Sequence, residues 1–305
     1  MRPKPLALAA LALALVLPVS PAAAAEVHYF NVPQGDHPHD VAPAPDGTVW
    51  YTGQRAGLLG RLDPNTGRAH SARSGLNAVV RVDPATREVK SWKLPKDRAN
   101  ANLNTLAFDR RDRLWFTGQS GIYGRLDPKS GEMQVWDAPK GVGPYGITAM
   151  PDGAIYYVSL GGSFLGKPDL ETGDTAVIEP QTPRAGTRRV WSDSKGRLCV
   201  SEWNAGNLSI YDPASQSWEV YKLPGDSPHT YAVYVDGKDK VWVSDFGANA
   251  ILRFDPDTKS FASFPSDKPD AAVRQLNGRQ GEVWGAESGT DRLVVIRTGE
   301  KQAKD

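Results

Sequence analysis

Six polar residues share one place in a repeated pattern of this sequence, and their types could bind or deprotonate a small molecule. Most of them lie about ten or eleven residues before the second position of a short β-rich run such as Leu-Trp-Phe-Thr. The six are His39, Asn104, Tyr145, Arg189, His229 and Arg274. Histidine can accept a proton near neutral pH, and arginine binds anions and developing negative charge. We expect the two histidines and Arg274 to be catalytic and the other three to bind an anionic or ester-containing ligand.

The pattern fixes these positions to within one residue. In one repeat Arg188 and Arg189 both fit, and in the last repeat the position falls on Val273 or Arg274. Polar residues at strand starts can also do no more than satisfy buried backbone groups or line a water-filled channel. The pattern therefore indicates a small-molecule site without identifying the molecule.

Self-similarity predicts how these residues are brought together. The β-rich runs at 114–117, 155–158, 198–201, 241–244 and 283–286 recur about every 42 residues. Between them stand turns of the Arg-Leu-Asp-Pro type, as at 61–64 and 125–128. A fixed period of this length is typical of a β-propeller, in which each repeat forms a four-stranded blade and the inner strands surround a channel. The sequence thus predicts an all-β propeller whose polar residues converge at its centre.

Two irregularities bear on the number of blades. Residues 26–33 resemble an outer strand but precede the first inner strand, and the last repeat ends after its third strand near Arg297. We expect the N-terminal strand to complete the last blade and close the ring. The Asp-Pro turns at 64 and 84 are only 20 residues apart, so residues 75–95 read as the outer half of a truncated second blade. This interpretation gives a seven-bladed β-propeller; six blades and an inserted hairpin are the alternative.

The first 25 residues have the pattern of a signal peptide. Arg2 and Lys4 precede an apolar run at 6–17, and the segment ends in small residues at 23–25. A basic start, an apolar stretch and an A-x-A site are the marks of a cleaved secretory signal, and the run is short for a membrane span. We expect residues 1–25 to be removed, 26–299 to form one propeller domain and 300–305 to be a polar tail. The mature protein would be exported to the periplasm or the cell exterior.

Composition narrows the range of partners. The 36 basic and 35 acidic residues nearly cancel, which gives no indication of a nucleic acid or an anionic membrane as partner. No later apolar stretch is long enough to span a bilayer. The single cysteine, Cys199, excludes an intramolecular disulfide and lies in an apolar strand, where we expect a buried thiol. A closed ring predicts a monomer that binds a small molecule at its central funnel.

Several motifs together carry a resemblance to a known family. They are Gly143-Pro144-Tyr145-Gly146-Ile147, Pro38-His39-Asp40-Val41, Pro228-His229-Thr230 and Trp115-Phe116-Thr117. In these motifs, and in its Gly-Arg-Leu-Asp-Pro turns, the chain resembles the streptogramin B lyases, or virginiamycin B lyases. The resemblance extends over the whole mature chain. It implies a seven-bladed propeller that opens a cyclic depsipeptide at its ester bond by elimination, an activity that gives antibiotic resistance.

The resemblance also implies a cofactor and site residues. The family uses Mg²⁺ held by glutamates, with a histidine base in the last blade. On this basis His229 matches a family histidine of the penultimate blade, and Glu287 lies near a metal-binding glutamate. The chain departs from the family where Ala271-Ala272-Val273-Arg274 replaces Glu-Pro-His-Gly, so the usual base and one metal carboxylate are missing. His39 stands where the family has a tyrosine.

Two classes of function remain open on the sequence. The first is an enzyme, either a carbon–oxygen lyase of the family type or a lactone hydrolase of the gluconolactonase type. The second is a non-catalytic propeller that binds a ligand or another protein. The missing histidine and glutamate favour the second class, and the polar funnel favours the first.

Overall fold

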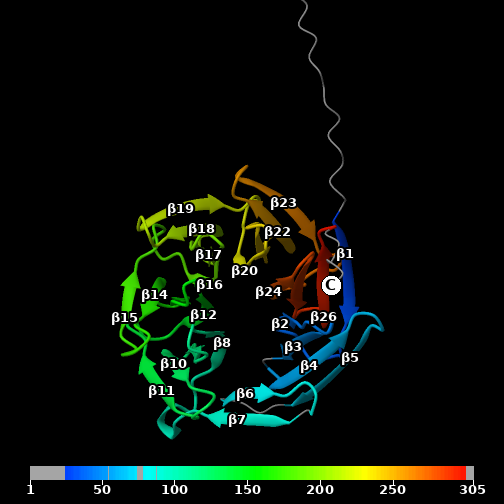
Figure 1. The fold of residues 1–305 in the computed structure, drawn as a ribbon. Coiled ribbons are helices and arrows are strands. Elements are labelled where there is room, and N and C mark those ends of the chain that lie inside the picture. The colour runs from blue at the N-terminus through cyan, green and yellow to red at the C-terminus, as the bar shows by residue number, and fades with distance from the viewer. Residues whose placement is uncertain (1–24, 54, 74–77, 87, 300–305) are drawn as a thin grey trace, which may run out of the picture.

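Small antiparallel sheets are arranged in a ring around a central axis (Figure 1). The computed structural model describes residues 25–53, 55–73, 78–86 and 88–299. Within these ranges the strands form six four-stranded sheets and one two-stranded sheet. The predicted all-β propeller is therefore confirmed. The proposed signal peptide and the polar tail at 300–305 lie outside the described residues, apart from Ala25.

Five blades are formed by consecutive strands, each numbered from the channel outward. The first blade contains β2 (Asp40–Pro43), β3 (Val49–Gly53), β4 (Leu58–Asp63) and β5 (Arg68–Arg73). The next contains β8 (Leu103–Phe108), β9 (Leu114–Gly118), β10 (Ile122–Leu126) and β11 (Met133–Asp137). It is followed by β12 (Pro144–Ala149), β13 (Ile155–Ser159), β14 (Phe164–Pro168) and β15 (Thr175–Ile178). The remaining two contain β16 (Thr187–Ser192), β17 (Leu198–Glu202), β18 (Asn207–Asp212) and β19 (Ser217–Lys222), then β20 (Thr230–Val235), β21 (Val241–Asp245), β22 (Ala250–Asp255) and β23 (Ser260–Pro265).

The sixth blade joins the two ends of the chain. It contains β24 (Val273–Arg279), β25 (Glu282–Glu287), β26 (Arg292–Arg297) and, as its outer strand, β1 (Glu26–Asn31). β1 pairs antiparallel with β26 from Glu26 opposite Arg297 to Asn31 opposite Arg292. The expected closure by the N-terminal strand is confirmed. It pairs the edge of β26, which would otherwise be open to another chain.

The expectation of seven blades is corrected to six. The residues read as a truncated second blade form only the hairpin β6 (Ala78–Val82) and β7 (Val89–Lys93), a separate two-stranded sheet. The short interval between the Asp-Pro turns leaves no room for two further strands of five or six residues and their turns. The hairpin lies at the rim between the first blade and the β8–β11 blade (Figure 1). A short 3-10 turn, η1 (Lys96–Arg98), follows it.

Inner strands pack against one another around most of the channel. The contacts run from β8 through β12, β16, β20 and β24 to β2. No comparable packing joins β2 to β8 in the described part of the chain. The consequence is visible on β8, where Leu106 and Phe108 are 51% and 54% exposed. Between the first blade and the β8–β11 blade, the described chain has no inner strands of a further blade. One apolar face of β8 is therefore exposed to solvent.

The repeated sequence motifs have identifiable structural causes. In the Asp-Pro turns the aspartate accepts hydrogen bonds from backbone N–H groups two and three residues later, as Asp127 does from Lys129 (2.7 Å) and Ser130 (3.2 Å). Gly131 closes that turn with a positive φ of 82°. The buried indole of Trp115 donates to Asp109 (2.9 Å), and that of Trp242 donates to Asp236 (2.8 Å). In these two blades the acidic first turn therefore pairs with the tryptophan of the following strand.

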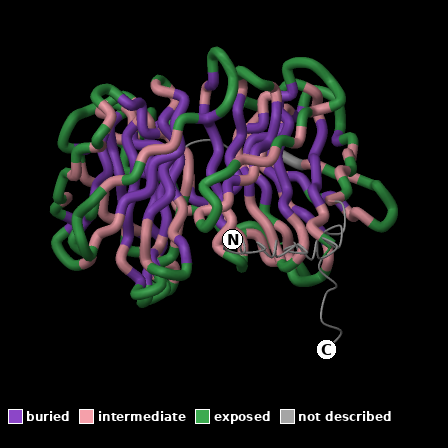
Figure 2. Tube along the Cα trace, turned by 90° about the horizontal axis from the view of Figure 1, so that it is seen from above, coloured by how far each residue is buried: buried purple, intermediate pink, exposed green. Residues whose placement is uncertain are grey.

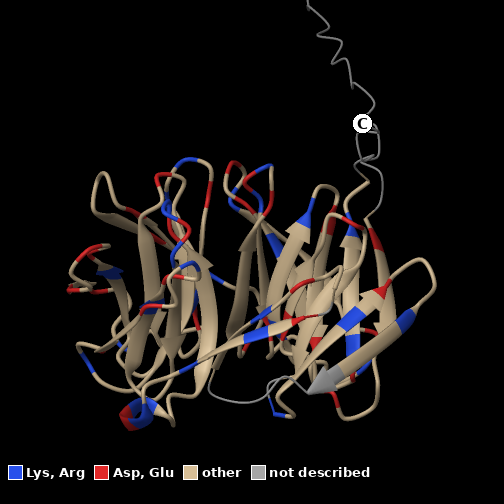
Figure 3. Cartoon of the chain, turned by 60° about the horizontal axis from the view of Figure 1, so that its bottom comes forward, with Lys and Arg blue, Asp and Glu red and all other residues tan. Residues whose placement is uncertain are grey.

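Most strand residues are buried or partly buried, whereas the connecting loops are largely exposed (Figure 2). The largest side chains with almost no exposed surface include Trp115, Trp242, Trp284 and Phe254. Cys199 is fully buried in the same layer, and burial raises the pKa of its thiol. Acidic and basic side chains are intermingled over the loops (Figure 3). No helix in the described residues is long and apolar enough to cross a bilayer.

Candidate functional site

Bulges in the inner strands position the side chains of the central site. Pairing between the first and second strands shifts register at the start of β8, β12, β16, β20 and β24. A bulge leaves residues out of the regular pairing and re-aims their side chains. The skipped residues are Asn104–Thr105, Tyr145–Gly146, Arg188–Arg189, Tyr231–Ala232 and Arg274–Gln275. Side chains from these bulges meet across blades, so the bulges account for the convergence that the repeat predicts.

Hydroxyl groups of second strands hold several of these bulges in place. Ser201 donates to the Tyr231 carbonyl of the next blade at 2.6 Å. Ser244 donates to the Val273 carbonyl, beside Arg274, at 2.7 Å. Thr117 donates to the Tyr145 carbonyl in the same way. The Ser or Thr two residues after the Trp-type position therefore fixes the backbone of the neighbouring bulge.

A chain of polar contacts orients the imidazole of His39. Its Nδ1 lies 3.1 Å from a carboxylate oxygen of Asp40. The other oxygen of Asp40 accepts a hydrogen bond from Arg189 at 2.8 Å, and Arg189 also donates to Thr105 at 2.5 Å. His39 and Arg189 are both 4% exposed. The Nε2 of His39 is buried and has no hydrogen-bond partner.

The charges around His39 assign its tautomer. Burial raises the pKa of Asp40, but the Arg189 guanidinium and the imidazole outweigh it and hold that pKa well below its usual range. Asp40 is therefore an acceptor, and the Nδ1 of His39 must carry the proton that it shares with Asp40. Burial also lowers the pKa of His39, so the ring is neutral. Its Nε2 is left as an unprotonated acceptor, which is the state that a general base requires.

Two tyrosines and two arginines without carboxylate partners occupy the centre beside this chain. The hydroxyls of Tyr145 and Tyr231 are hydrogen-bonded to each other. The guanidinium carbon of Arg188 lies 3.6 Å from the centroid of the Tyr231 ring, and that of Arg274 lies 5.6 Å from it. Arg274 donates to the Tyr231 hydroxyl at 3.3 Å and to Ser288 at 2.6 Å. Neither Arg188 nor Arg274 forms an ion pair with a described residue.

The positive charge affects the tyrosine pair. Burial raises the pKa of Tyr231, but the guanidiniums of Arg188 and Arg189 lower it by more, so that its net pKa is below the ordinary value. Burial raises the pKa of Tyr145, and the neighbouring Tyr231 raises it further. Trp203 stands edge-on to Tyr231, with the ring centroids 5.6 Å apart. The centre is thus a positively charged site walled by aromatic rings.

A cavity of about 290 Å³ opens beside His39 between the first and the closing blade. Its charged or titratable lining consists of His37, His39, Arg55 and Arg274. Among the described residues, no carboxylate lines this cavity. His39 and two guanidiniums, those of Arg55 and Arg274, therefore line one space that is large enough for a small organic molecule.

His229 lies apart from that cavity. It precedes β20, its Nδ1 is 3.0 Å from the Ser227 carbonyl, and its ring is 5.2 Å from that of Trp203. It reaches the site through Trp203 and Phe246, both of which contact Tyr231. The other five predicted residues are connected to one another, either directly or through one intervening residue. Asn104, for example, is connected through Thr105, whose hydroxyl donates a hydrogen bond to the Asn104 side chain at 2.7 Å.

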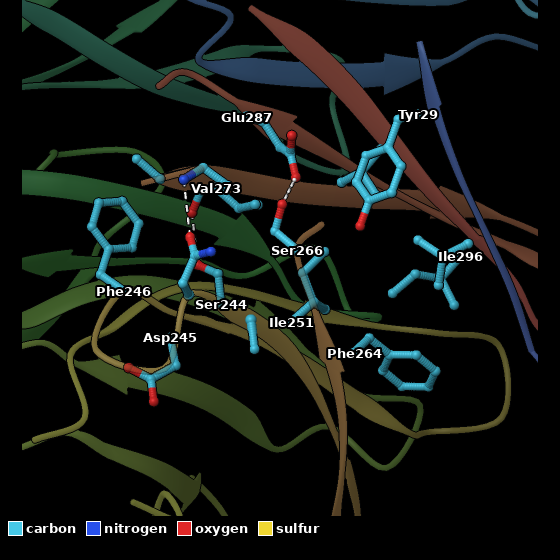
Figure 4. A pocket seen from close by; sticks show the side chains of 16 residues that line it. Tyr29, Ser244, Asp245, Phe246, Ile251, Phe264, Ser266, Val273, Glu287 and Ile296 are labelled. Atoms are coloured by element: carbon cyan, nitrogen blue, oxygen red, sulfur yellow. Dashed lines mark hydrogen bonds between the residues drawn. The ribbon is translucent and has the colours of Figure 1, made fainter. Parts of the chain in front are cut away.

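Glu287 is engaged elsewhere. Its carboxylate accepts hydrogen bonds from Ser266 (2.9 Å), Thr290 (2.7 Å) and Arg292 (2.8 Å), and it is 1% exposed. Figure 4 shows it pointing to Ser266 beside a small cavity between the last two blades, with Asp245 turned away from it. No group of three or more His, Cys, Asp or Glu in the described residues is arranged to hold a metal ion. These residues do not fit a Mg²⁺ site.

Sequence reasoning missed Tyr231 and Asp40. Tyr231 lies eleven residues before Trp242, at the spacing that gives Asn104 and Tyr145 in their blades. Strict counting would have found it, whereas the Pro-His motif drew attention to His229. Asp40 follows His39 directly and starts β2, but nothing in the spacing shows that its carboxylate bridges His39 and Arg189.

Solved structures of similar fold include two lyases. Virginiamycin B lyase from Staphylococcus aureus matches with a TM-score of 0.81 and 17% identity over 90% of this chain and 99% of that one. A streptogramin B lyase matches with a TM-score of 0.80 and 19% identity over 90% and 97%. An extracellular domain of a putative hybrid two-component system from B. thetaiotaomicron matches with a TM-score of 0.72 and 14% identity over 92% and 44%. At these identities the likeness concerns the fold.

The sequence itself gives a family match. No curated protein sequence matches the chain. The family model described as the virginiamycin B lyase family matches residues 67–304, which is most of the chain and includes four complete blades and three strands of the closing blade. On this match, supported by the propeller fold, the chain belongs to the virginiamycin B lyase family.

Proposed function

We propose that this propeller is an exported carbon–oxygen lyase that opens an ester by elimination at its central cavity. His39 is the general base, oriented by Asp40, and Arg274 stabilises the negative charge that develops on the activating carbonyl. The observation that carries the proposal is the buried Nε2 of His39, which has no partner. Burying an unpaired acceptor costs free energy unless a ligand satisfies it.

The reaction needs no water and no oxidant. His39 removes the proton from the carbon next to a carbonyl, and the electron pair of that bond moves toward the carbonyl as an enolate. The pair then forms the new C=C bond while the C–O bond to the neighbouring carbon breaks. The leaving oxygen takes both electrons of that bond and the proton from His39. One substrate molecule thus gives a ring-opened isomer if cyclic, or two products if linear.

Arginine replaces the cation that the family's chemistry would use. Developing enolate charge must be stabilised for such a proton to be removed. Because the residues here do not fit Mg²⁺, we derive no step from a metal. Arg274 lines the same cavity as His39 and forms no ion pair with a described residue, so its charge is available to the substrate.

A second candidate function is ligand binding without turnover by a monomeric, exported propeller. It is favoured by the absence of a histidine from residues 271–274 of the closing blade, where the family resemblance places its base. Binding would use the same cavity and the same arginines. The two candidate functions make different predictions for His39. A lyase needs His39 for turnover, whereas a binding protein needs it at most for affinity for the ligand.

The test is an elimination assay on residues 26–305. The probes are a streptogramin B depsipeptide and two chromogenic ethers, 3-(4-nitrophenoxy)propanoate and the corresponding amide. Mass spectrometry distinguishes an isobaric ring-opened depsipeptide from a hydrolysed one, which gains a water. We expect an elimination product from at least one probe, abolished in His39→Gln and retained in Arg110→Gln, an exposed control far from the cavity. Binding without any product from a folded protein would favour the second candidate, and a hydrolysed product would exclude elimination.

A further inference from the structure

The arginines of the central site carry more positive charge than the protein neutralises. Arg188, Arg189 and Arg274 surround Tyr231, and Asp40 is the one carboxylate that pairs with any of them in the described structure. Its partner is Arg189. Arg188 has a weak contact of 3.5 Å with the Tyr145 hydroxyl, and its Nε is buried without a partner. Arg188 and Arg274 are partly buried, where their attraction to an opposite charge is stronger than in bulk water, so the site favours the entry of an anion.

The position of Arg274 determines where the anion would bind. Arg274 and His39 line the same cavity. Its Nε is fixed by Ser288 and one terminal nitrogen by Tyr231, so the guanidinium is held in a defined orientation. Arg188 adds positive charge 3.6 Å from the centroid of the Tyr231 ring. A planar guanidinium of this kind matches the two oxygens of a carboxylate.

We propose that the ligand is a carboxylate, bound by Arg274 beside His39, and that this carboxylate is the group that activates the neighbouring proton. This substrate class rests on the proposed elimination. The substrate would be an anion with an oxygen substituent two carbons from the carboxylate carbon. Removing a proton next to a carboxylate builds a second negative charge on it, and Arg274 and Arg188 offset that charge. The products are an unsaturated carboxylate and the released alcohol or acid.

Binding and turnover are measured separately. Calorimetry compares 3-(4-nitrophenoxy)propanoate with its neutral amide in wild type, His39→Gln, Arg274→Gln, Arg274→Lys and the control Arg110→Gln. We expect the carboxylate to bind about tenfold to a hundredfold more tightly than the amide. Arg274→Gln should remove that preference, Arg274→Lys should keep part of it, and His39→Gln should keep all of it. The preference should also weaken as salt is added.

Each outcome decides one of the two proposals. Equal binding of carboxylate and amide to wild type, or an unchanged preference in a folded Arg274→Gln protein, overturns the carboxylate proposal even if elimination occurs. Carboxylate binding lost in Arg274→Gln but without elimination leaves the anion site standing and overturns the lyase. The absorbance of tyrosinate gives a further readout. If Tyr231 is ionised at neutral pH and stays so on adding the carboxylate, the protein supplies its own anion and the proposal fails.

Discussion

The neutral state of His39 gives the protein a dependence on pH that can be measured without any substrate. Because burial lowers the pKa of His39, the folded protein binds fewer protons than the unfolded chain. Its contribution to stability is fully present above about pH 6.5, the ordinary histidine value, and is lost as the pH falls through the lowered pKa. Urea unfolding at a series of pH values should show this loss in wild type. His39→Gln should flatten the curve in that range, and the exposed control His28→Gln should leave it unchanged.

Asp40 is expected to be important for folding as well as for orienting His39. Asp40→Asn keeps the shape but removes the charge that compensates Arg189, which is buried. Removing one partner of a buried ion pair costs about 3–5 kcal/mol, and the 27% exposure of the Asp40 side chain places the expected loss near the lower end. Equilibrium unfolding above pH 6 measures it. A matched control is Asp46→Asn, whose pair with Arg61 is about half exposed and should cost less than about 1 kcal/mol.

At this scale the sequence predicted residue types better than their partners. The repeat pattern predicted five residues that contacts connect at the centre of the structure. It could do so because the spacing of a residue from the β-rich run determines its blade and its place at the start of an inner strand. It could not show that Asp40 would bridge His39 and Arg189 across blades. It also could not show that Glu287 would be used by Arg292, because neighbours within the closing blade decide that. The role of a single residue therefore could not be assigned without the side-chain contacts that the structure shows.

At the scale of elements, β8 differs from the other inner strands because it exposes two large apolar side chains, Leu106 and Phe108. Leu106 lies opposite Phe116 in the β8–β9 pairing, and Leu276 lies opposite Gly285 in the β24–β25 pairing, at the same step after the bulge. Leu276 is fully buried between blades, whereas Leu106 is 51% exposed because no inner strand covers it. The same side chain at the same register thus has two environments.

This difference gives a matched pair of substitutions. Leu276→Ala should cost about 2–5 kcal/mol, as a buried leucine truncated to alanine does. Leu106→Ala should cost less than about 1 kcal/mol, because little surface is lost from the core. Urea unfolding of both variants measures the difference. Similar losses in the two would mean that Leu106 is covered in solution, and the description of β8 as an uncovered strand would be wrong.

The blade count shows where repeat reasoning stops. The shortened interval between two Asp-Pro turns predicted correctly that half of a blade is missing. Counting that half as a blade was wrong, because β6 and β7 pair only with each other and supply no inner strand to the channel. The sequence period counts blades by their recurring turns. A blade of the structure, however, needs inner strands that lie beside the central channel.

For the whole molecule, closure of the ring depends on one short strand. β1 supplies the outer strand of the last blade, and its side chains also enter the core, where Phe30 stacks on Trp284 with ring centroids 5.6 Å apart. The sequence predicted this closure, because a strand-like segment without a blade and a blade without its last strand can complete each other. A closed ring ties the chain ends together, so contacts far apart in sequence become interdependent.

Removing residues 26–31 tests that dependence. The deletion exposes the edge of β26, together with apolar side chains that β1 covers, and we expect a loss on the order of 5 kcal/mol or association through the open edge. Phe30→Ala should cost an intermediate amount, about 3 kcal/mol or less because the ring is only partly buried, and His28→Thr on the exposed face should change little. Thermal unfolding with light scattering measures stability and association together. A deletion variant that stays monomeric with an unchanged Tm would show that the remaining blades hold the ring without β1. Stability would then lie in the packing between blades, and closure would serve only to protect an edge.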